Sequence, residues 1–232
     1  MNYAIIAAGD GKRLREEGIK TPKPLIKING IEMIKRLLDI FDKNYATKVS
    51  VIVNESFTEV TDFIASQKYQ FPVKIKVKST PSSMHSLYEL KDLIGNTSFC
   101  LTTVDTFFNE EEFKLFINYA ESQKEKDAVM GITSFIDDEK PLFIETQGDR
   151  IIEFSDDKKN STYVSGGIYF FRPVIWEVLQ NTINAGINRM RNFQRELLKA
   201  GLSVGFHEFS KIIDVDHVKD IETAENLNIK NN

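Results

Sequence analysis

Residues 1–30 read MNYAIIAAGDGKRLREEGIKTPKPLIKING, and they indicate the fold more directly than any other part of the chain. The run YAIIAA (3–8) is continuously apolar, which is typical of a parallel strand buried on both faces of a sheet. It ends at Gly9 and leads into a segment that holds Gly11 and six basic residues. This composition, directly after a first buried strand, predicts an anion-binding loop at the carboxyl end of a parallel sheet.

Two common phosphate-binding loops do not fit this segment. A dinucleotide fingerprint requires G-x-G-x-x-G, and after Gly9 and Gly11 the third position is Leu14. A P-loop requires G-x-x-x-x-G-K followed by Ser or Thr, but here the first position is Ile6 and the last is Arg13. The loop is therefore expected to hold its anion in another way.

Two of the basic side chains are suited to a phosphate group. The planar guanidinium of Arg13 can donate to two phosphate oxygens at once. Lys23 lies between Pro22 and Pro24, which restrict its backbone, so it loses little freedom when it binds. Because of these prolines and Gly18, we expect an irregular segment after Gly11. The alternative, from spacing alone, is a solvated basic surface loop.

Strands and helices alternate through the first 122 residues. This order predicts a doubly wound α/β sheet with right-handed crossovers. The predicted strands are 3–8, 48–54, 73–78 and 98–105, and the predicted helices are 31–43, 57–67 and 83–94.

The second half of the chain has a different pattern. Four short strands are expected between residues 128 and 171, which suggests an antiparallel or mixed extension of the same sheet. Helices follow at 173–181 and 188–200, then a strand at 203–209. The end of the chain, 212–229, reads as a strand followed by a helix. There is no linker, so one compact domain is predicted.

Composition limits the classes of function. The chain has 232 residues, 41% hydrophobic and 28% charged, with a formal net charge of −4. This balance argues against non-specific nucleic-acid binding, and no run approaches the ~18 apolar residues of a membrane span. The single cysteine, Cys100, excludes a disulfide framework. We expect a cytoplasmic protein that does not bind membranes; a homo-oligomer is possible.

Three aspartates follow apolar strands and are candidate metal ligands. Asp105 ends the predicted fourth strand, and Asp214 and Asp216 belong to the late segment IIDVDHV. Strand alternation places the last two on one face, and alternation does not decide between them. Carboxylates at such positions suit Mg²⁺, which phosphate transfer usually requires. The alternatives are a turn residue at 105 and a helix N-cap at 216.

The order of these motifs resembles the nucleotidyltransferases that make nucleoside-diphosphate sugars, together with choline-phosphate cytidylyltransferase-like enzymes. Three positions depart from the family pattern: Ala8 replaces a glycine, Lys12 a Ser or Thr, and Glu32 a common Pro. The resemblance spans essentially the whole chain. The family pattern is roughly G-G-x-G-[ST]-R-[LM], then P-K-x-[LM], then G-x-P-[LM]-[IL]. The residues that match it are Gly9, Gly11, Arg13, Leu14, Pro22, Lys23, Leu25, Gly30 and Ile34.

The resemblance implies a Rossmann-like (GT-A-like) nucleotidyltransferase domain over 1–232, with a nucleotide-binding half (1–122) and an acceptor-binding half (123–232). Arg13 and Lys23 become the catalytic residues, and Asp105 and Asp216 the Mg²⁺ ligands. Gly167 and Asp157 are the expected acceptor contacts, although the family's E-K-P sequence is missing near 157. The expected nucleotide contacts are Ala8, Gly9, Gly11, Lys12, Ser83 and Ser86.

The function implied is transfer of a nucleotidyl group from an NTP to a phosphomonoester, with release of pyrophosphate. The acceptor is a sugar-1-phosphate or, alternatively, an amino-alcohol phosphate such as phosphocholine. A non-catalytic nucleotide-binding relative and a glycosyltransferase of related architecture are the other readings. Two interpretations remain for Arg189, Arg191 and Arg195: they are solvated surface charges, or they contact the acceptor phosphate.

Overall fold

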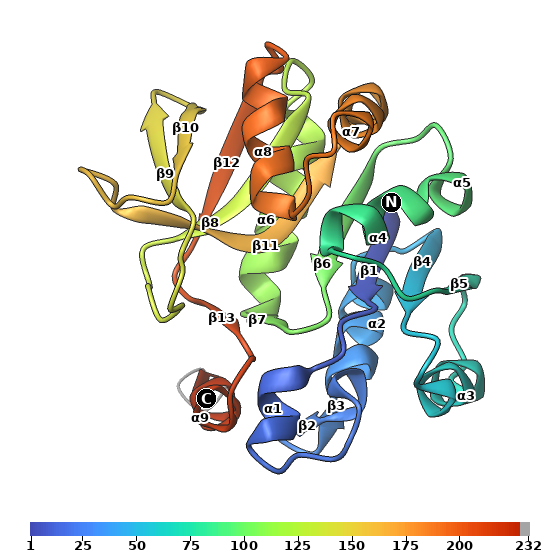
Figure 1. Ribbon diagram of the computed structural model, residues 1–232. Coiled ribbons are helices and arrows are strands. Elements are labelled where there is room, and N and C mark those ends of the chain that lie inside the picture. The colour runs from blue at the N-terminus through green and yellow to red at the C-terminus, as the bar shows by residue number, and fades with distance from the viewer. Residues whose placement is uncertain (228–232) are drawn as a thin grey trace.

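The computed structural model describes residues 1–227 and is built around a nine-stranded mixed sheet (Figure 1). Four parallel strands form its first half in the order β5-β4-β1-β6. Consecutive strands therefore wind outward from β1 in one direction, and the chain then returns to place β6 on the other side of β1. The bounds are β1 (Asn2–Ala7), β4 (Lys48–Val53), β5 (Val73–Val77) and β6 (Phe99–Thr103).

The second half extends this sheet mostly with antiparallel pairs, and the strand at 204–209 pairs parallel with the strand at 128–133. The long strand β11 (Tyr163–Phe171) pairs antiparallel with β6, with β8 and with β9, so it joins the two halves. The mixed extension predicted from the short strands is confirmed. Its other members are β8 (Ala128–Thr133), β9 (Phe143–Gln147), β10 (Arg150–Ser155) and β12 (Val204–Phe209).

Helices cover both faces of the sheet, which confirms the doubly wound arrangement. Each face has its own apolar core, because alternate side chains of the central strands point to opposite sides. One layer consists of α2 (Met33–Lys43), α3 (Thr58–Ser66), α6 (Glu110–Ser122) and α9 (Val218–Leu227). The other consists of α4 (Ser83–Glu89), α5 (Lys91–Ile94), α7 (Ile175–Asn184) and α8 (Met190–Lys199).

The segment after Gly11 is more regular than predicted. Gly11 adopts φ 61°, and directly after it α1 (Lys12–Glu16) forms, so the expectation of an irregular chain is wrong there. Leu14 is buried in the core, and this tertiary contact explains why five residues with no acid in the first turn are helical. A 3₁₀ turn at Lys23–Leu25 follows the prolines.

Other boundaries shift by a few residues. The helix predicted at 31–43 begins at Met33, because 31 and 32 form β3 (Ile31–Glu32) in a hairpin with β2 (Lys27–Ile28). The helix predicted at 83–94 is divided at Leu90.

The C-terminal strand and helix are both present. Strand β13 (Ile212–Asp214) pairs with β7 (Thr106–Phe108), and α9 follows. The last two residues of the predicted segment, 228–229, lie outside the described residues. In Figure 1 the C-terminal α9 lies beside the N-terminal hairpin, and the side-chain amide of Asn29 donates to the backbone oxygen of Glu225 at 3.1 Å. The C-terminal helix therefore packs against the hairpin formed by residues 27–32.

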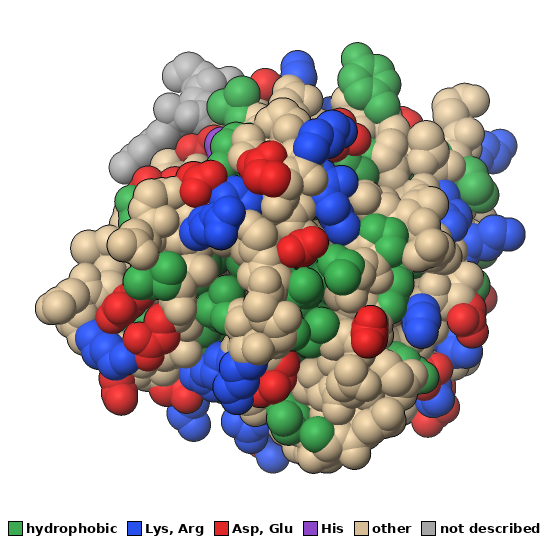
Figure 2. All heavy atoms as spheres, turned by 90° about the horizontal axis from the view of Figure 1, so that it is seen from above, with side chains coloured by type: hydrophobic (Ala, Val, Ile, Leu, Met, Phe, Trp, Pro, Cys, Tyr) green, Lys and Arg blue, Asp and Glu red, His purple; other side chains and the backbone are tan. Residues whose placement is uncertain are grey.

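On the face that Figure 2 shows, the surface is not dominated by charges of one sign. Lysine and arginine side chains are interspersed there with aspartate and glutamate. Among residues 1–227, no helix is long and apolar enough to cross a bilayer.

Candidate active site

Three carboxylates meet at the carboxyl end of the central strands. Asp105 lies in the turn between β6 and β7, and Asp214 ends β13, which is paired with β7. The amide of Val215 donates to the backbone oxygen of Asp105 at 3.0 Å, which holds the two turns together. One carboxylate oxygen from each of Asp105, Asp214 and Asp216 lies within 4.8 Å of the others.

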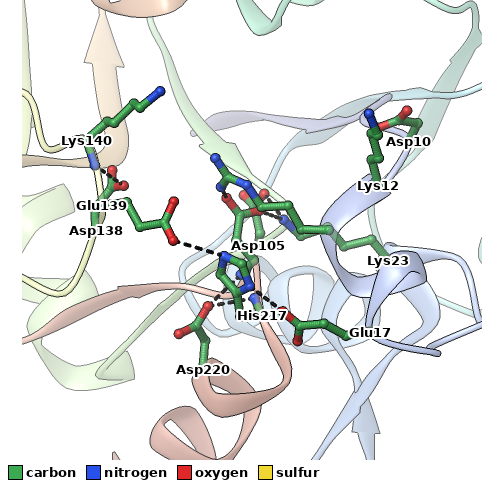
Figure 3. Close-up of polar contacts among 12 residues, drawn as sticks. Asp10, Lys12, Glu17, Lys23, Asp105, Asp138, Glu139, Lys140, His217 and Asp220 are labelled. Atoms are coloured by element: carbon green, nitrogen blue, oxygen red, sulfur yellow. Dashed lines mark hydrogen bonds and ion pairs between the residues drawn. The ribbon is translucent and has the colours of Figure 1, made fainter.

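Lys23 is the centre of this cluster. Its side chain is only 7% exposed, and its ammonium donates to Asp105 Oδ2 at 2.6 Å and to Asp216 Oδ1 at 2.6 Å. Figure 3 shows the lysine extending from its loop to the turn that carries Asp105. Arg13 forms an ion pair with the other oxygen of Asp216. The two predicted catalytic residues and the two predicted metal ligands are thus in direct contact.

The charges in the cluster reinforce one another. Burial works to lower the pKa of Lys23, but the carboxylates, Asp105 first, outweigh it and raise that pKa above its usual range. Burial likewise works to raise the pKa of Asp105, and the Lys23 ammonium reverses it and holds that pKa low. Both groups are therefore charged at neutral pH.

Asp214 differs from its neighbours. Its carboxylate is open to a cavity but surrounded by protein, and this burial, with the charge of Asp105, raises its pKa well above the usual range. Within residues 1–227 the Asp214 carboxylate accepts no hydrogen bond and forms no ion pair. A cation at this point would relieve the repulsion. An oxygen-only set of three carboxylates fits a hard divalent metal ion, so the residues present suit such an ion.

A cavity of about 780 Å³ lies above the cluster, a volume typical of small-molecule sites. All six predicted nucleotide contacts line it: Ala8, Gly9, Gly11, Lys12, Ser83 and Ser86. A Cβ on Gly11 would lie 3.3 Å from the Cβ of Lys23, so this glycine also makes room for the lysine.

Sequence reasoning missed several polar residues of this cavity, among them Asn54 and Thr80. Asn54 Nδ2 donates to the backbone oxygen of Ala8 at 3.0 Å, and its Oδ1 accepts from Ser79 Oγ at 3.2 Å. Thr80 Oγ1 shares a 2.6 Å hydrogen bond with Ser86 Oγ. Asn54 directly follows the parallel strand β4, and this position in the sequence could have indicated that it lies at the ligand site.

A second cavity, of about 310 Å³, adjoins the first and is the candidate acceptor site. Gly167 lines it with φ 74°, and a Cβ there would lie 2.6 Å from Thr106 Oγ1. Both the conformation and the close approach require glycine. The other predicted acceptor contact, Asp157, is exposed and lies outside the linings of both cavities. Its neighbour Asp156 instead holds Arg191 at 2.7 Å.

The second cavity carries more acidic than basic side chains. Its basic residues are Arg13, Arg189, Arg191 and Lys219. Its acidic residues are Asp137, Asp138, Glu139, Asp214, Asp216 and Asp220.

The start of α9 is tied to the N-terminal loop. Glu17 accepts from the amide of Val218 at 2.7 Å and is hydrogen-bonded to the ring of His217 (Figure 3). The carboxylate of Asp220 accepts from the amide of Asp216 at 3.0 Å. These contacts fix the backbone on which Asp216 stands. Sequence spacing gave no signal for them, because Glu17 and Val218 are 201 positions apart.

The first cavity, the buried lysine and the carboxylates lie where the strand order reverses, between β1 and β6. These features define an α/β protein with a candidate ligand site at its topological switch point. The family model described as "Nucleotidyl transferase" matches residues 3–226, and the chain belongs to that family. The family resemblance predicted from the sequence is confirmed.

Individual relatives are distant. The chain is 23% identical over 239 residues to the bifunctional protein GlmU of Methanococcus vannielii, a match that covers all of this chain and 56% of that protein. This chain thus spans about half the length of that relative.

Solved structures confirm the fold. A putative glucose-1-phosphate thymidylyltransferase from Bacillus anthracis superposes with a TM-score of 0.86 at 21% identity, over 100% of this chain and 96% of that one. The inositol-1-phosphate CTP transferase from T. maritima superposes with a TM-score of 0.82 at 17% identity, over 97% and 94%.

Proposed function

We propose that this protein transfers the nucleotidyl group of an NTP to a phosphomonoester and releases pyrophosphate. The observation that carries this proposal is the buried Lys23 between Asp105 and Asp216, at the floor of a nucleotide-sized cavity. Family membership supports it, and so do the names of the solved relatives, which act on glucose-1-phosphate and inositol-1-phosphate.

In the proposed reaction, an oxygen of the acceptor phosphate attacks the α-phosphorus of the NTP. A new P–O bond forms, the bond between the α-phosphorus and the bridging oxygen breaks, and its electron pair leaves with pyrophosphate. The acceptor phosphate is already ionised at neutral pH, so no protein nucleophile or base is required. Catalysis consists of positioning and charge stabilisation.

The roles of the residues follow from their places. Arg13 and Lys12, which line the first cavity, bind the β- and γ-phosphates, and Gly9 and Gly11 let the backbone approach them. Lys23 stabilises the charge that develops on the phosphates. Asp105 and Asp216, with Asp214 beside them, would hold Mg²⁺, and this ion would neutralise phosphate charge when bound.

The two halves of the chain divide these tasks. Residues 1–122 supply most of the nucleotide cavity, including Ser83 and Ser86, and residues 123–232 supply most of the acceptor cavity, including Gly167. Asp216 belongs to the second half of the chain but lines the nucleotide cavity, which the first half mostly forms.

A second candidate acceptor is an amino-alcohol phosphate. The observation that favours it is the acidic run Asp137, Asp138 and Glu139 along the acceptor cavity, which suits a cationic group. Attraction between such unlike charges is strong where water is partly excluded.

The test is a panel of the four common NTPs against glucose 1-phosphate, inositol 1-phosphate and phosphocholine, with pyrophosphate release as the readout. The proposal predicts acceptor-dependent release with at least one pair, abolished by a chelator. Tight nucleotide binding without release for any pair would instead indicate a non-catalytic relative.

A further inference from the structure

The paired strands β7 and β13 form a short ribbon that carries two of the three clustered carboxylates. Asp105 directly precedes β7, and Asp214 ends β13, opposite Thr106. This two-stranded ribbon is separate from the nine-stranded sheet, so no ladder of backbone hydrogen bonds with that sheet sets its position. Other contacts must therefore hold the ribbon, and with it the carboxylates, in place.

Arg36 of α2 makes such contacts with the ribbon. Its guanidinium carbon lies 3.8 Å from the centroid of the Phe107 ring and 5.0 Å from that of the Phe108 ring. Its Nη2 donates to the backbone oxygen of Phe108. These two phenylalanines are the last residues of β7, so one planar cation fixes both rings and the main chain of the strand.

The burial of Arg36 is costly. The residue is 6% exposed, and within residues 1–227 no carboxylate pairs with it and its Nε has no hydrogen-bond partner. Burial lowers its pKa to about 10, so it is still charged at neutral pH. An apolar side chain of similar volume would fill this space without the cost of a buried charge. Stability alone therefore does not account for an arginine at this position.

The ribbon connects Arg36 to the carboxylates over a short distance in the chain. Phe107 is two residues from Asp105, and the strand register pairs it with Ile213, the residue before Asp214. A shift or rotation of the ribbon would change the spacing of the clustered carboxylate oxygens, which lie within 4.8 Å of one another. Mg²⁺ requires closely defined oxygen positions and is sensitive to such a change.

Resting on the metal site proposed above, we propose that Arg36 is a positioning residue that sets the spacing of Asp105 and Asp214 for a divalent ion. It contacts neither the ion nor the substrates, because it is buried against β7 and does not line either cavity. It acts through the paired strands, in the way that groups behind metal ligands orient them and control metal affinity.

The test is binding of Mn²⁺ to the whole protein, measured by electron paramagnetic resonance. Arg36→Met removes the charge and the donor but keeps most of the volume, and we expect it to raise the Kd for Mn²⁺ about 10-fold. Arg36→Lys keeps a charge and a donor for the backbone oxygen of Phe108, so it should recover part of this loss. In both variants the Mg²⁺ concentration for half-maximal activity should rise in step, with the nucleotide KM changed less.

The matched control is Phe41→Leu on the same helix. Phe41 is fully buried and stacks on Tyr3 with ring centroids 4.2 Å apart, and it makes no contact with the rings that Arg36 covers. This variant should lower the melting temperature at least as much as Arg36→Met does, yet keep the wild-type Kd for Mn²⁺. An equal loss of Mn²⁺ binding in Phe41→Leu would indicate general loosening of the core and would overturn the proposal.

The remaining outcomes separate this proposal from the proposed function. If the wild type releases pyrophosphate and Arg36→Met binds Mn²⁺ as the wild type does, the role of Arg36 is wrong and the function stands. If no acceptor of the panel reacts, the function fails and Mn²⁺ binding still decides on Arg36. If Arg36→Met does not fold, Arg36→Lys decides: a raised Kd supports the role and a wild-type Kd overturns it. A wild type that binds no Mn²⁺ overturns it as well.

Discussion

The ammonium of Lys23 lies 2.6 Å from Asp105 Oδ2 and 2.6 Å from Asp216 Oδ1, and so joins three segments of the chain that are far apart in sequence. One partner is 82 residues away and the other 193. The lysine is buried and the carboxylates face the nucleotide cavity. The predictions below depend on this arrangement and on its surroundings.

Replacing Lys23 by alanine is expected to lower turnover at least about a hundredfold, which corresponds to ~3 kcal/mol of transition-state stabilisation. The loss follows from removing a buried cation that contacts two carboxylates and is proposed to face the phosphates. Steady-state pyrophosphate release measures it, and circular dichroism checks that the variant is folded. A folded Lys23→Ala with wild-type turnover would contradict the assigned role.

The carboxylates are expected to differ in their response to metal. Asp105→Asn removes a proposed metal ligand and one of the two partners of Lys23 together, so we expect activity to be lost at every Mg²⁺ concentration. Asp214→Asn leaves the ion pairs of Lys23 intact, and we expect activity that is restored in part by excess Mg²⁺. A titration of activity against Mg²⁺ for both variants distinguishes them. Identical metal dependence in Asp214→Asn and wild type would exclude Asp214 from the site.

Gly167→Ala tests the acceptor cavity. The added Cβ meets Thr106 Oγ1 at 2.6 Å, so the variant is expected to raise the acceptor KM and lower the melting temperature. Gly148→Ala is the matched control, since Gly148 also has positive φ (59°) but no heavy atom within 4 Å of a new Cβ. If both variants change the acceptor KM equally, the cavity has been assigned wrongly.

Glu17→Gln tests how the C-terminal segment is positioned. It removes a charged acceptor of the amide of Val218 and of His217, so the turn that carries Asp216 loosens. We expect a reduced kcat with little change in the nucleotide KM. Glu16→Gln serves as the control and should behave as wild type, since among residues 1–227 Glu16 pairs only with exposed Lys12, at 3.7 Å.

Asp149→Asn tests a structural ion pair away from the site. Lys126 is 1% exposed and pairs with Asp149 at 2.7 Å, so the variant deprives a buried ammonium of this charged partner and lowers the melting temperature. The hydrogen bond from Lys126 holds the pKa of Asp149 below its usual range. The stabilisation is therefore present above about pH 4 and is lost as pH falls through the depressed pKa. Thermal unfolding from pH 7 down to pH 3 should show the gap between variant and wild type closing.

Much of the site could be predicted because it follows strand ends. Gly9, Gly11 and Asp105 come directly after buried strands, and such positions converge at one edge of a parallel sheet. The short helix α1 could not be predicted, since burial of Leu14 and not local propensity stabilises it. The contacts of Glu17 join opposite ends of the chain and leave no local pattern.

Around the acceptor cavity, the sequence did not show which of two neighbouring residues makes a given contact. Asp157 was chosen by its likeness to a family position, yet the residue that holds Arg191 is Asp156, because β10 ends at Ser155 and the turn directs the next side chain to α8. Arg189 has a positive φ of 72°, a conformation that favours glycine. Nothing in the sequence around an arginine indicates such a conformation.

The most direct test of the central claim is ³¹P NMR of the wild type with Mg²⁺, the four NTPs in turn, and glucose 1-phosphate or inositol 1-phosphate. The account predicts that pyrophosphate and a nucleoside-diphosphate product appear together in equal amounts, only when acceptor is present, and that Lys23→Ala slows both about a hundredfold. Pyrophosphate release that does not need the acceptor, or a Lys23→Ala variant as fast as the wild type, would contradict it.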